Sequence, residues 1–320
     1  MQHNDLLIFG VDVAKAELVA VSADRGSRSL ALPNQATAIQ DWLATLARGS
    51  VVAMEATGKY HRLLAELAHA AGMRVYVLNA RDVHFYAKAL GARGKTDRVD
   101  AGVIARYVSQ HHSQLHAWEP AQGPQRLVQE LVQRRARVTE MRVSLRQTLD
   151  DVPLLAAAGQ PLLEQFERFI RELDGKLEEL LRSDPVLRCG AQRLRTLTGL
   201  GLQGSAYLAA LFSRLRFANA DAVVAYGGLD PRAEDSGTRH GKRKLSKRGP
   251  ALLRRQMYLA AFSACHSKAF GDWYASMRAR GYASTPTLVI LARKLLRIAW
   301  SMWNSEQSFD AQRLQRPAGA

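Results

Sequence analysis

Cysteine is scarce in this chain, which has two in 320 residues, Cys189 and Cys265. The two are far apart and form no Cys-x-x-Cys pair, which argues against a disulfide framework and a structural zinc site. No apolar run reaches the roughly 18 residues that a membrane-spanning helix needs. The start of the chain, residues 1–5, also lacks the basic flank of a signal peptide. The sequence therefore predicts a soluble, cytoplasmic protein without a membrane partner.

Acidic residues are also in short supply. The chain has 29 Asp and Glu against 45 Lys and Arg, a formal net charge of +16 and a pI near 10.3. A surplus of this size indicates a polyanionic partner, of which nucleic acid is the commonest. With 47% hydrophobic residues, the chain is long enough for more than one domain with its own core.

Two of the acids fall near the ends of predicted strands. Residues 7–14 form an apolar run that contains Asp12, and residues 51–58 repeat the pattern with Glu55. A lone carboxylate in a buried strand is unfavourable unless it is paired or binds a metal ion. The repeated pattern therefore makes both acids candidates for a functional site.

Asp97 and Asp100 precede an apolar helical run at 101–108. At a spacing of three, both carboxylates leave one face of a helix about one turn apart and can point at one cation. Acids in a first helical turn also balance the helix dipole, and this pair alone does not separate that role from a metal site. The strand acids favour convergence of all four carboxylates on one site: Asp12, Glu55, Asp97 and Asp100.

Such a cluster would repel itself without cations. Ligands that offer only oxygen favour hard Mg²⁺ or Mn²⁺. Two such ions about 3.5–4 Å apart are the usual means of in-line attack at a phosphodiester. The acids therefore predict metal-assisted chemistry on a nucleic acid.

Residues 5–108 alternate between strand and helix patterns. Besides the two acid-bearing strands, we expect strands at 17–22, 27–32 and 74–78, a hairpin turn at 23–26, and helices at 37–46, 60–71, 83–90 and from Asp97. A meander of three strands followed by strands that alternate with helices gives a mixed α/β sheet. Prolines and glycines from Trp118 to Pro124 mark a boundary.

A helical hairpin or coiled coil is predicted for 119–184. Its first helix has apolar residues at near-heptad spacing: Leu127, Leu131, Val138, Met141 and Leu145. Pro153 and Pro161 bracket a short bend, and the second helix carries Phe166, Ile170, Leu173, Leu177 and Leu180. The hairpin is either an internal spacer or a dimer seam. Its basic residues either contact nucleic acid or form a solvated face: Arg134, Arg135, Arg137, Arg142 and Arg146.

The rest of the chain, 185–320, is predicted to be mainly helical. Residues 194–201 are similar to a helix-hairpin-helix, whose Gly-x-Gly turn approaches a phosphate; the alternative is a helix-turn-helix packing corner. Amphipathic helices are expected at 256–266 and 287–303. Trp300 and Trp303 share one face of the second helix and are assigned to packing.

A serine at position 236 opens a run without acids that extends to Arg255. Flanking glycines and a proline place Ser236 in an irregular loop. A serine next to many cations is well placed to meet a phosphate. Ser246 lies within the run but has no following glycine, so it ranks below Ser236. We expect these residues, with Lys95, to contact nucleic acid: Arg239, Lys242, Arg243, Lys244, Lys247, Arg248, Arg254 and Arg255.

The order strand Asp, strand Glu and helix with two Asp resembles the DEDD set of RuvC-type resolvases. The local sequences around Asp12, Glu55 and Asp97 are similar to those of DEDD transposases of bacterial insertion sequences, the bridge-RNA-guided recombinases. A C-terminal signature of that family is matched by Gly228, Leu229 and Pro231, by Ser236 and Gly237, by Lys247 and Gly249, and by Leu253 and Arg254. The resemblance implies that Ser236 is the nucleophile.

The same resemblance implies three domains. They are a RuvC-like (RNase H-like) DEDD domain at 1–118, the hairpin at 119–184, and a C-terminal transposase domain at 185–320. It also implies a dimer assembling to a tetramer, donor and target DNA, a structured guide RNA and association with the bacterial nucleoid. Two alternatives stay open: a metal-dependent junction endonuclease that uses water, and a non-catalytic nucleic-acid-binding regulator.

Overall fold

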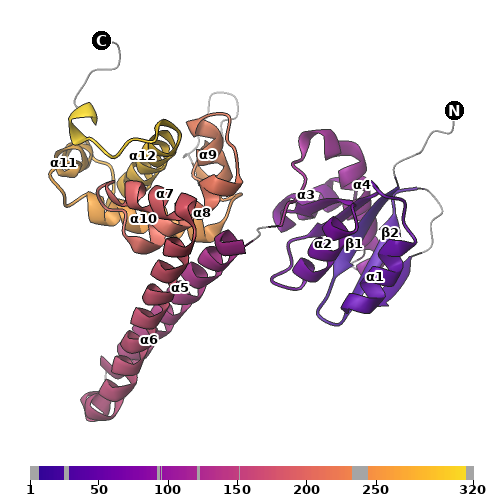
Figure 1. Ribbon diagram of the computed structural model, residues 1–320, viewed down its shortest axis with the longest axis horizontal. Helices are drawn as coiled ribbons and strands as arrows, with labels where there is room; N and C mark the ends of the chain where they lie inside the picture. Colours follow the sequence, from indigo (N-terminus) through magenta and orange to yellow (C-terminus); the bar gives the residue numbers. More distant parts are fainter. Residues whose placement is uncertain are drawn as a thin grey trace. The chain divides into compact units, whose positions relative to one another are not determined.

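A computed structural model describes residues 7–24, 29–91, 94, 96–120, 123–150, 152–232 and 244–314. The chain divides into two compact units, residues 1–120 and 121–320 (Figure 1). Within the described ranges, no helix is long and apolar enough to cross a membrane.

Unit 1 is built on a five-stranded sheet. Its strands are β1 (Ile8–Val13), β2 (Glu17–Ser22), β3 (Leu30–Pro33), β4 (Val51–Glu55) and β5 (Arg74–Leu78), in the order β3-β2-β1-β4-β5. The pairs β1–β2 and β2–β3 are antiparallel, whereas β4 is parallel to both β1 and β5. The predicted mixed sheet, with a meander followed by parallel strands, is therefore confirmed.

Helices cover both faces of this sheet. They are α1 (Ala36–Ala44), α2 (His61–Ala70), α3 (Ala80–Ala89) and α4 (Asp97–His111), followed by a 3₁₀ turn, η1 (His112–Gln114). Alternate strand residues point to opposite faces. Val11, Val52 and Met54 pack with α1 and α2 in one hydrophobic cluster, and Ala53 and Tyr76 pack with α3 and α4 in another. Unit 1 is thus a three-layer α/β/α structure.

Unit 2 contains the predicted helical hairpin, formed by α5 (Gly123–Asp150) and α6 (Ala156–Ser183). The two helices run side by side in Figure 1. A 3₁₀ turn, η2 (Pro153–Leu155), precedes α6. The expected bend does not extend to Pro161, which lies inside α6. Because Pro161 is only the sixth residue of that helix, it removes a single hydrogen bond close to the exposed tip.

The buried face of α5 differs from the predicted one. Leu127 and Met141 are exposed, whereas Val128, Val132 and Ala136 are buried. Val128 and Val132 belong to the same core as helix α8 (Leu202–Arg214). Packing against α8 as well as α6 therefore determines which face of α5 is buried. On α6, Leu173 and Leu177 are buried as predicted.

The remainder of unit 2 is a helical domain with one large core. Besides α8 it contains α7 (Pro185–Arg195), α9 (Ala220–Tyr226), β6 (Pro231–Arg232), β7 (Lys244–Leu245), α10 (Ala251–Ala264), α11 (Gly271–Ala279), α12 (Ser284–Ser305) and η3 (Ala311–Leu314). Trp303 contacts Phe212 at 5.8 Å between ring centroids, and both Trp300 and Trp303 pack against the core. Their predicted packing role is therefore confirmed.

The turn between α7 and α8 packs closely against α10. Gly199 has φ +91°, and a Cβ there would meet the carbonyl oxygen of Ala260. Gly201, in contrast, is the N-cap of α8 and has open space around it. The close packing of Gly199 favours a helix-turn-helix corner over a phosphate-binding turn.

Candidate active site

Two of the predicted acids lie at adjoining strand ends. The parallel register of β1 and β4 pairs Val11 with Met54. Asp12 and Glu55 are the next residues along the two strands, so they sit side by side at the carboxyl ends of β1 and β4. This is the expected placement of acids at neighbouring strand ends.

Both acids belong to the face of the sheet that α3 and α4 cover. Asp12 alternates with Gly10, and Glu55 alternates with Ala53, which packs in the cluster of α3 and α4. Asp12 and Glu55 are half-buried rather than enclosed. Their carboxylates are therefore sheltered at the edge of the layer and still accessible to a ligand.

Helix α4 crosses β1 on this face at very short range. A Cβ at Gly10 would overlap the carbonyl oxygen of Ala101 and the amide nitrogen of Ala105. Ala101 directly follows Asp100, so the first turn of α4 lies beside the contact between helix and strand. Glycine at position 10 is what allows this helix to approach.

The start of α4 is fixed by a capping side chain. Thr96 has extended backbone angles, and its Oγ1 accepts a hydrogen bond from the amide of Val99 at 3.3 Å. Asp97 and Asp100 fall in the first turn, the former exposed and the latter half-buried. The cap thus fixes the residue at which α4 begins, and with it the positions of Asp97 and Asp100 in the first turn.

The four acids are all within the described residues, and their oxygens are the ligands that Mg²⁺ and Mn²⁺ prefer. The described ranges nevertheless contain no three His, Cys, Asp or Glu side chains close enough together to hold a metal ion. The donor chemistry therefore fits a hard divalent ion, and the structure brings the supporting elements together without gathering the carboxylates into a closed cluster.

Several predicted site residues lie outside the described residues. They are Lys95, Ser236, Arg239, Lys242 and Arg243. The hairpin turn expected at 23–26 is described only as far as Asp24. The structure does describe both flanks of the segment that contains Ser236: β6 on one side and β7 on the other, which pair antiparallel.

The described basic residues after this segment divide into two groups. Lys244, Lys247 and Arg248 are exposed. Arg255, on α10, forms an ion pair with Glu140 of α5 at 3.6 Å, and Arg254 bonds to main-chain carbonyl groups. The exposed group is better placed to contact a nucleic acid than the residues on α10.

Most of the arginines on the hairpin form ion pairs. Arg135 donates to Asp174 through Nε and Nη2, at 3.2 and 3.1 Å, and Arg137 pairs with Glu140 at 3.3 Å. These contacts give the side chains partners within the hairpin itself. Ion pairing is therefore a third role for these arginines, beside nucleic-acid contact and a solvated face.

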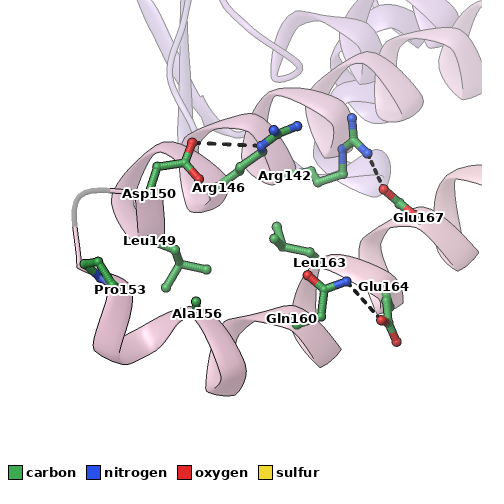
Figure 2. Close-up of a pocket in the computed structure, with 10 residues that line it drawn as sticks. All are labelled: Arg142, Arg146, Leu149, Asp150, Pro153, Ala156, Gln160, Leu163, Glu164 and Glu167. Carbon is green, nitrogen blue, oxygen red and sulfur yellow. Dashed lines mark hydrogen bonds and ion pairs between the residues drawn. The ribbon is translucent and has the colours of Figure 1, made fainter.

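A hollow of about 500 Å³ opens near the hairpin tip, between α5 and α6 (Figure 2). Arg142 pairs with Glu167, Arg146 with Asp150, and Gln160 donates to Glu164 at 3.0 Å. Each charged side chain drawn in Figure 2 thus has a partner on the lining itself. The hollow is formed by helix packing around paired charges, and it contains none of the four acids.

Sequence reasoning missed a pair of partners beside the Ser236 segment. The hydroxyl of Ser246 donates to the carboxylate of Asp230, and Ser246 is only 2% exposed. The sequence holds no local signal of this pair, because 16 positions separate the two residues. Only the pairing of β6 with β7 brings them together.

Comparison with known proteins places this chain among transposases. One family model, described as "Transposase", matches residues 9–154, and a second, "Transposase IS116/IS110/IS902 family", matches residues 191–275. The pilin gene-inverting protein of Moraxella bovis is 26% identical over 262 residues, 80% of this chain and 81% of that protein.

An insertion-element protein gives a further match. It is the IS110 uncharacterized 43.6 kDa protein of Streptomyces coelicolor, 29% identical over 175 residues, 54% of this chain and 40% of that protein. Transposases act on DNA, and those of the DEDD type typically depend on a metal ion. With family matches in both units, the chain belongs to the IS116/IS110/IS902 family of insertion-sequence transposases and recombinases.

Proposed function

We propose that this protein is a DNA recombinase whose chemistry uses the acids of unit 1 and Ser236 of unit 2. Unit 1 is taken as an RNase H-like domain of the RuvC type. One observation carries the proposal: Asp12 and Glu55 adjoin at the ends of parallel strands, on the face where α4 begins with Asp97 and Asp100.

Ser236 is the proposed nucleophile. Its Oγ attacks phosphorus, a serine–phosphate bond forms, one phosphorus–oxygen bond of the DNA strand breaks, and the departing oxygen takes up a proton. Two ions of Mg²⁺ or Mn²⁺ would be held by the four acids and would supply Lewis-acid polarisation of the phosphate. Basic residues of the 239–255 run balance the charge of the pentacoordinate phosphate.

A covalent intermediate suits the chemistry of strand exchange. The serine–phosphate ester retains the free energy of the broken bond, so a second strand end can displace the serine without a nucleotide cofactor. Inversion of a gene, which the name of the Moraxella relative denotes, also requires breaking and rejoining of strands. This agreement supports attack by an enzyme group rather than by water.

The proposed partners are donor and target DNA, a structured guide RNA, and further copies of the chain in a dimer that assembles to a tetramer. Base pairing with a guide would supply sequence specificity, leaving the protein to bind shape and backbone. Exposed apolar side chains on the hairpin are the candidates for this self-association, because larger exposed apolar patches mark interaction sites: Leu127, Met141, Val143, Val152, Leu154, Leu155, Leu162 and Phe169.

The first experiment separates a serine mechanism from hydrolysis. Purified protein is incubated with Mg²⁺, element-end DNA and the RNA transcribed beside the gene, and the products are run on a denaturing gel. We expect a covalent protein–DNA band in the wild type that disappears in Ser236→Ala. Asp12→Ala should also abolish adduct formation and strand exchange.

Matched controls are available for both substitutions. Ser301→Ala, at an exposed position of α12, and Asp41→Ala, at an exposed position of α1, should retain the wild-type adduct yield. Cleaved DNA without an adduct in both wild type and Ser236→Ala would contradict the serine mechanism and favour a hydrolytic junction nuclease. Undiminished exchange in Asp12→Ala would contradict the metal site.

A further inference from the structure

Two main-chain segments of unit 2 cross in direct contact. Residues 226–228 end α9 and follow it, and residues 247–249 precede α10. A Cβ at Gly228 would lie 2.7 Å from the amide nitrogens of Arg248 and Gly249, and one at Gly249 would overlap the carbonyl oxygen of Tyr226. The crossing therefore excludes a side chain at both glycines.

Hydrogen bonds hold the two segments together at the crossing and next to it. The amide of Lys247 donates to the carbonyl of Gly228 at 3.1 Å, and the amide of Ser246 donates to the carbonyl of Asp230 at 3.0 Å. The Ser246 hydroxyl also donates to the Asp230 carboxylate. Because Ser246 is 2% exposed, water has little access to compete for this bond.

Arg254 joins the same two segments from α10. Its Nη1 donates to the carbonyl of Gly227 at 3.2 Å and to that of Gly249 at 2.5 Å. Burial lowers the pKa of this guanidinium, although arginine stays protonated in proteins. The guanidinium therefore bonds one carbonyl oxygen from each segment. Such charge-assisted hydrogen bonds are stronger than neutral ones.

The backbone at the crossing is strained. Lys247 has φ +52°, a left-handed conformation that is unfavourable for a residue with a Cβ. Such strain persists only where the surroundings determine the conformation, and it concentrates at functional sites. The hydrogen bonds of Lys247, Ser246 and Arg254 supply that constraint here.

We propose that Asp230, Ser246 and Arg254 are positioning residues that clamp the two ends of segment 233–243, and that they set the rate of attack by Ser236 without contacting DNA themselves. This inference rests on the proposed function, because Ser236 belongs to the clamped segment. Arg254, which the sequence predicts to bind nucleic acid, is here assigned to holding the main chain in place.

The effect of the clamp should appear in the chemical step. A displacement of about 1 Å at a reacting atom lowers a rate by about 100-fold. Loss of a phosphate contact instead weakens binding and reduces the slope of log affinity against log salt by about one. A positioning role and a DNA-binding role of Arg254 therefore predict different results.

The test compares Ser246→Ala and Arg254→Ala with wild type in the full-length protein. Adduct formation at saturating DNA should slow by about 10- to 100-fold. DNA affinity and its salt dependence should stay unchanged. Asp230→Asn, which keeps an acceptor for the Ser246 hydroxyl, should retain more of the rate than Asp230→Ala. Arg216→Ala, which removes an exposed arginine outside the clamp, is the control.

Hydrogen exchange of the amides of Ser246 and Lys247 tests the clamp separately from catalysis. Both amides should exchange faster in Ser246→Ala and Arg254→Ala than in wild type. Unchanged exchange, unchanged adduct rates, or a smaller salt slope as the only effect of Arg254→Ala would each overturn the proposal. An adduct that persists in Ser236→Ala would overturn the proposed nucleophile, and with it the catalytic role of the clamp, while the exchange data would still report whether the clamp exists.

Discussion

Gly10 shows how a single residue sets the position of a helix over the candidate site. Its lack of a Cβ lets the main chain of α4 lie against β1 at Ala101 and Ala105. Main-chain atoms cannot turn aside as a flexible side chain can. The distance between the strand that carries Asp12 and the helix that carries Asp97 therefore depends on this glycine.

Substitution of Gly10 by alanine should destabilise unit 1. The added Cβ forces α4 away from β1, and such overpacking costs about 1–3 kcal/mol. The measurement is the free energy of unfolding in denaturant. Gly102→Ala, in the same helix with open space around it, should instead gain about 0.5–1 kcal/mol. Equal stability of Gly10→Ala and wild type would show that the contact is loose.

At the scale of elements, the carboxylate of Asp174 links both hairpin helices to α8. Asp174 of α6 accepts hydrogen bonds from Arg135 of α5 and, at 2.7 Å, from Gln203 of α8. The side chains of Arg135 and Asp174 are 27% and 26% exposed, so solvent screens them only in part. Three helices thus meet at one carboxylate.

Arg135→Ala should lower the free energy of unfolding of unit 2 by about 1–2 kcal/mol, because two charge-assisted bonds are lost and Asp174 keeps only Gln203. Thermal or denaturant unfolding gives the value. Arg137→Ala is the control, because the Arg137–Glu140 pair is 73% and 48% exposed and should contribute no more than about 0.5 kcal/mol. Equal losses in both variants would contradict the three-helix junction.

The strands of unit 1 were predictable because apolar, β-branched runs repeat with turns between them. The predicted ranges 17–22 and 74–78 coincide with β2 and β5. The buried face of α5 was not predictable, because its packing against α8 depends on a partner about 70 positions away. Helix α11 was not predicted at all.

The candidate site was also predictable only in part. Asp12 and Glu55 could be placed at strand ends because the sheet order followed from the element pattern. The role of Arg254 could not, because a basic run gives no sign of which arginine turns inward. The glycines at 227, 228 and 249, on either side of the serine segment, were the usable signal of a close main-chain crossing.

At the scale of the whole molecule, positive charge is divided unequally between the units. Residues 121–320 contain 32 Lys and Arg against 18 Asp and Glu, whereas residues 1–120 contain 13 against 11. The net charges are therefore +14 and +2, and they account for the total of +16. Electrostatic attraction to DNA should come mainly from unit 2.

Separate expression of the two units tests this division. Each has its own hydrophobic clusters, so each should fold alone. Fluorescence anisotropy against salt should give residues 121–320 most of the DNA affinity and salt dependence of the full chain, and residues 1–120 little of either. Circular dichroism is the control for folding. Comparable salt slopes for both units would contradict the expected division.

The crossing of residues 226–228 with 247–249 is held by residues that flank the stretch between them. Its ends are fixed by main-chain contacts, by the Asp230–Ser246 pair and by Arg254, all of which lie outside residues 233–243. None of the described contacts that hold the crossing uses a side chain from those 11 positions, so the crossing should survive substitutions among them, Ser236→Ala included.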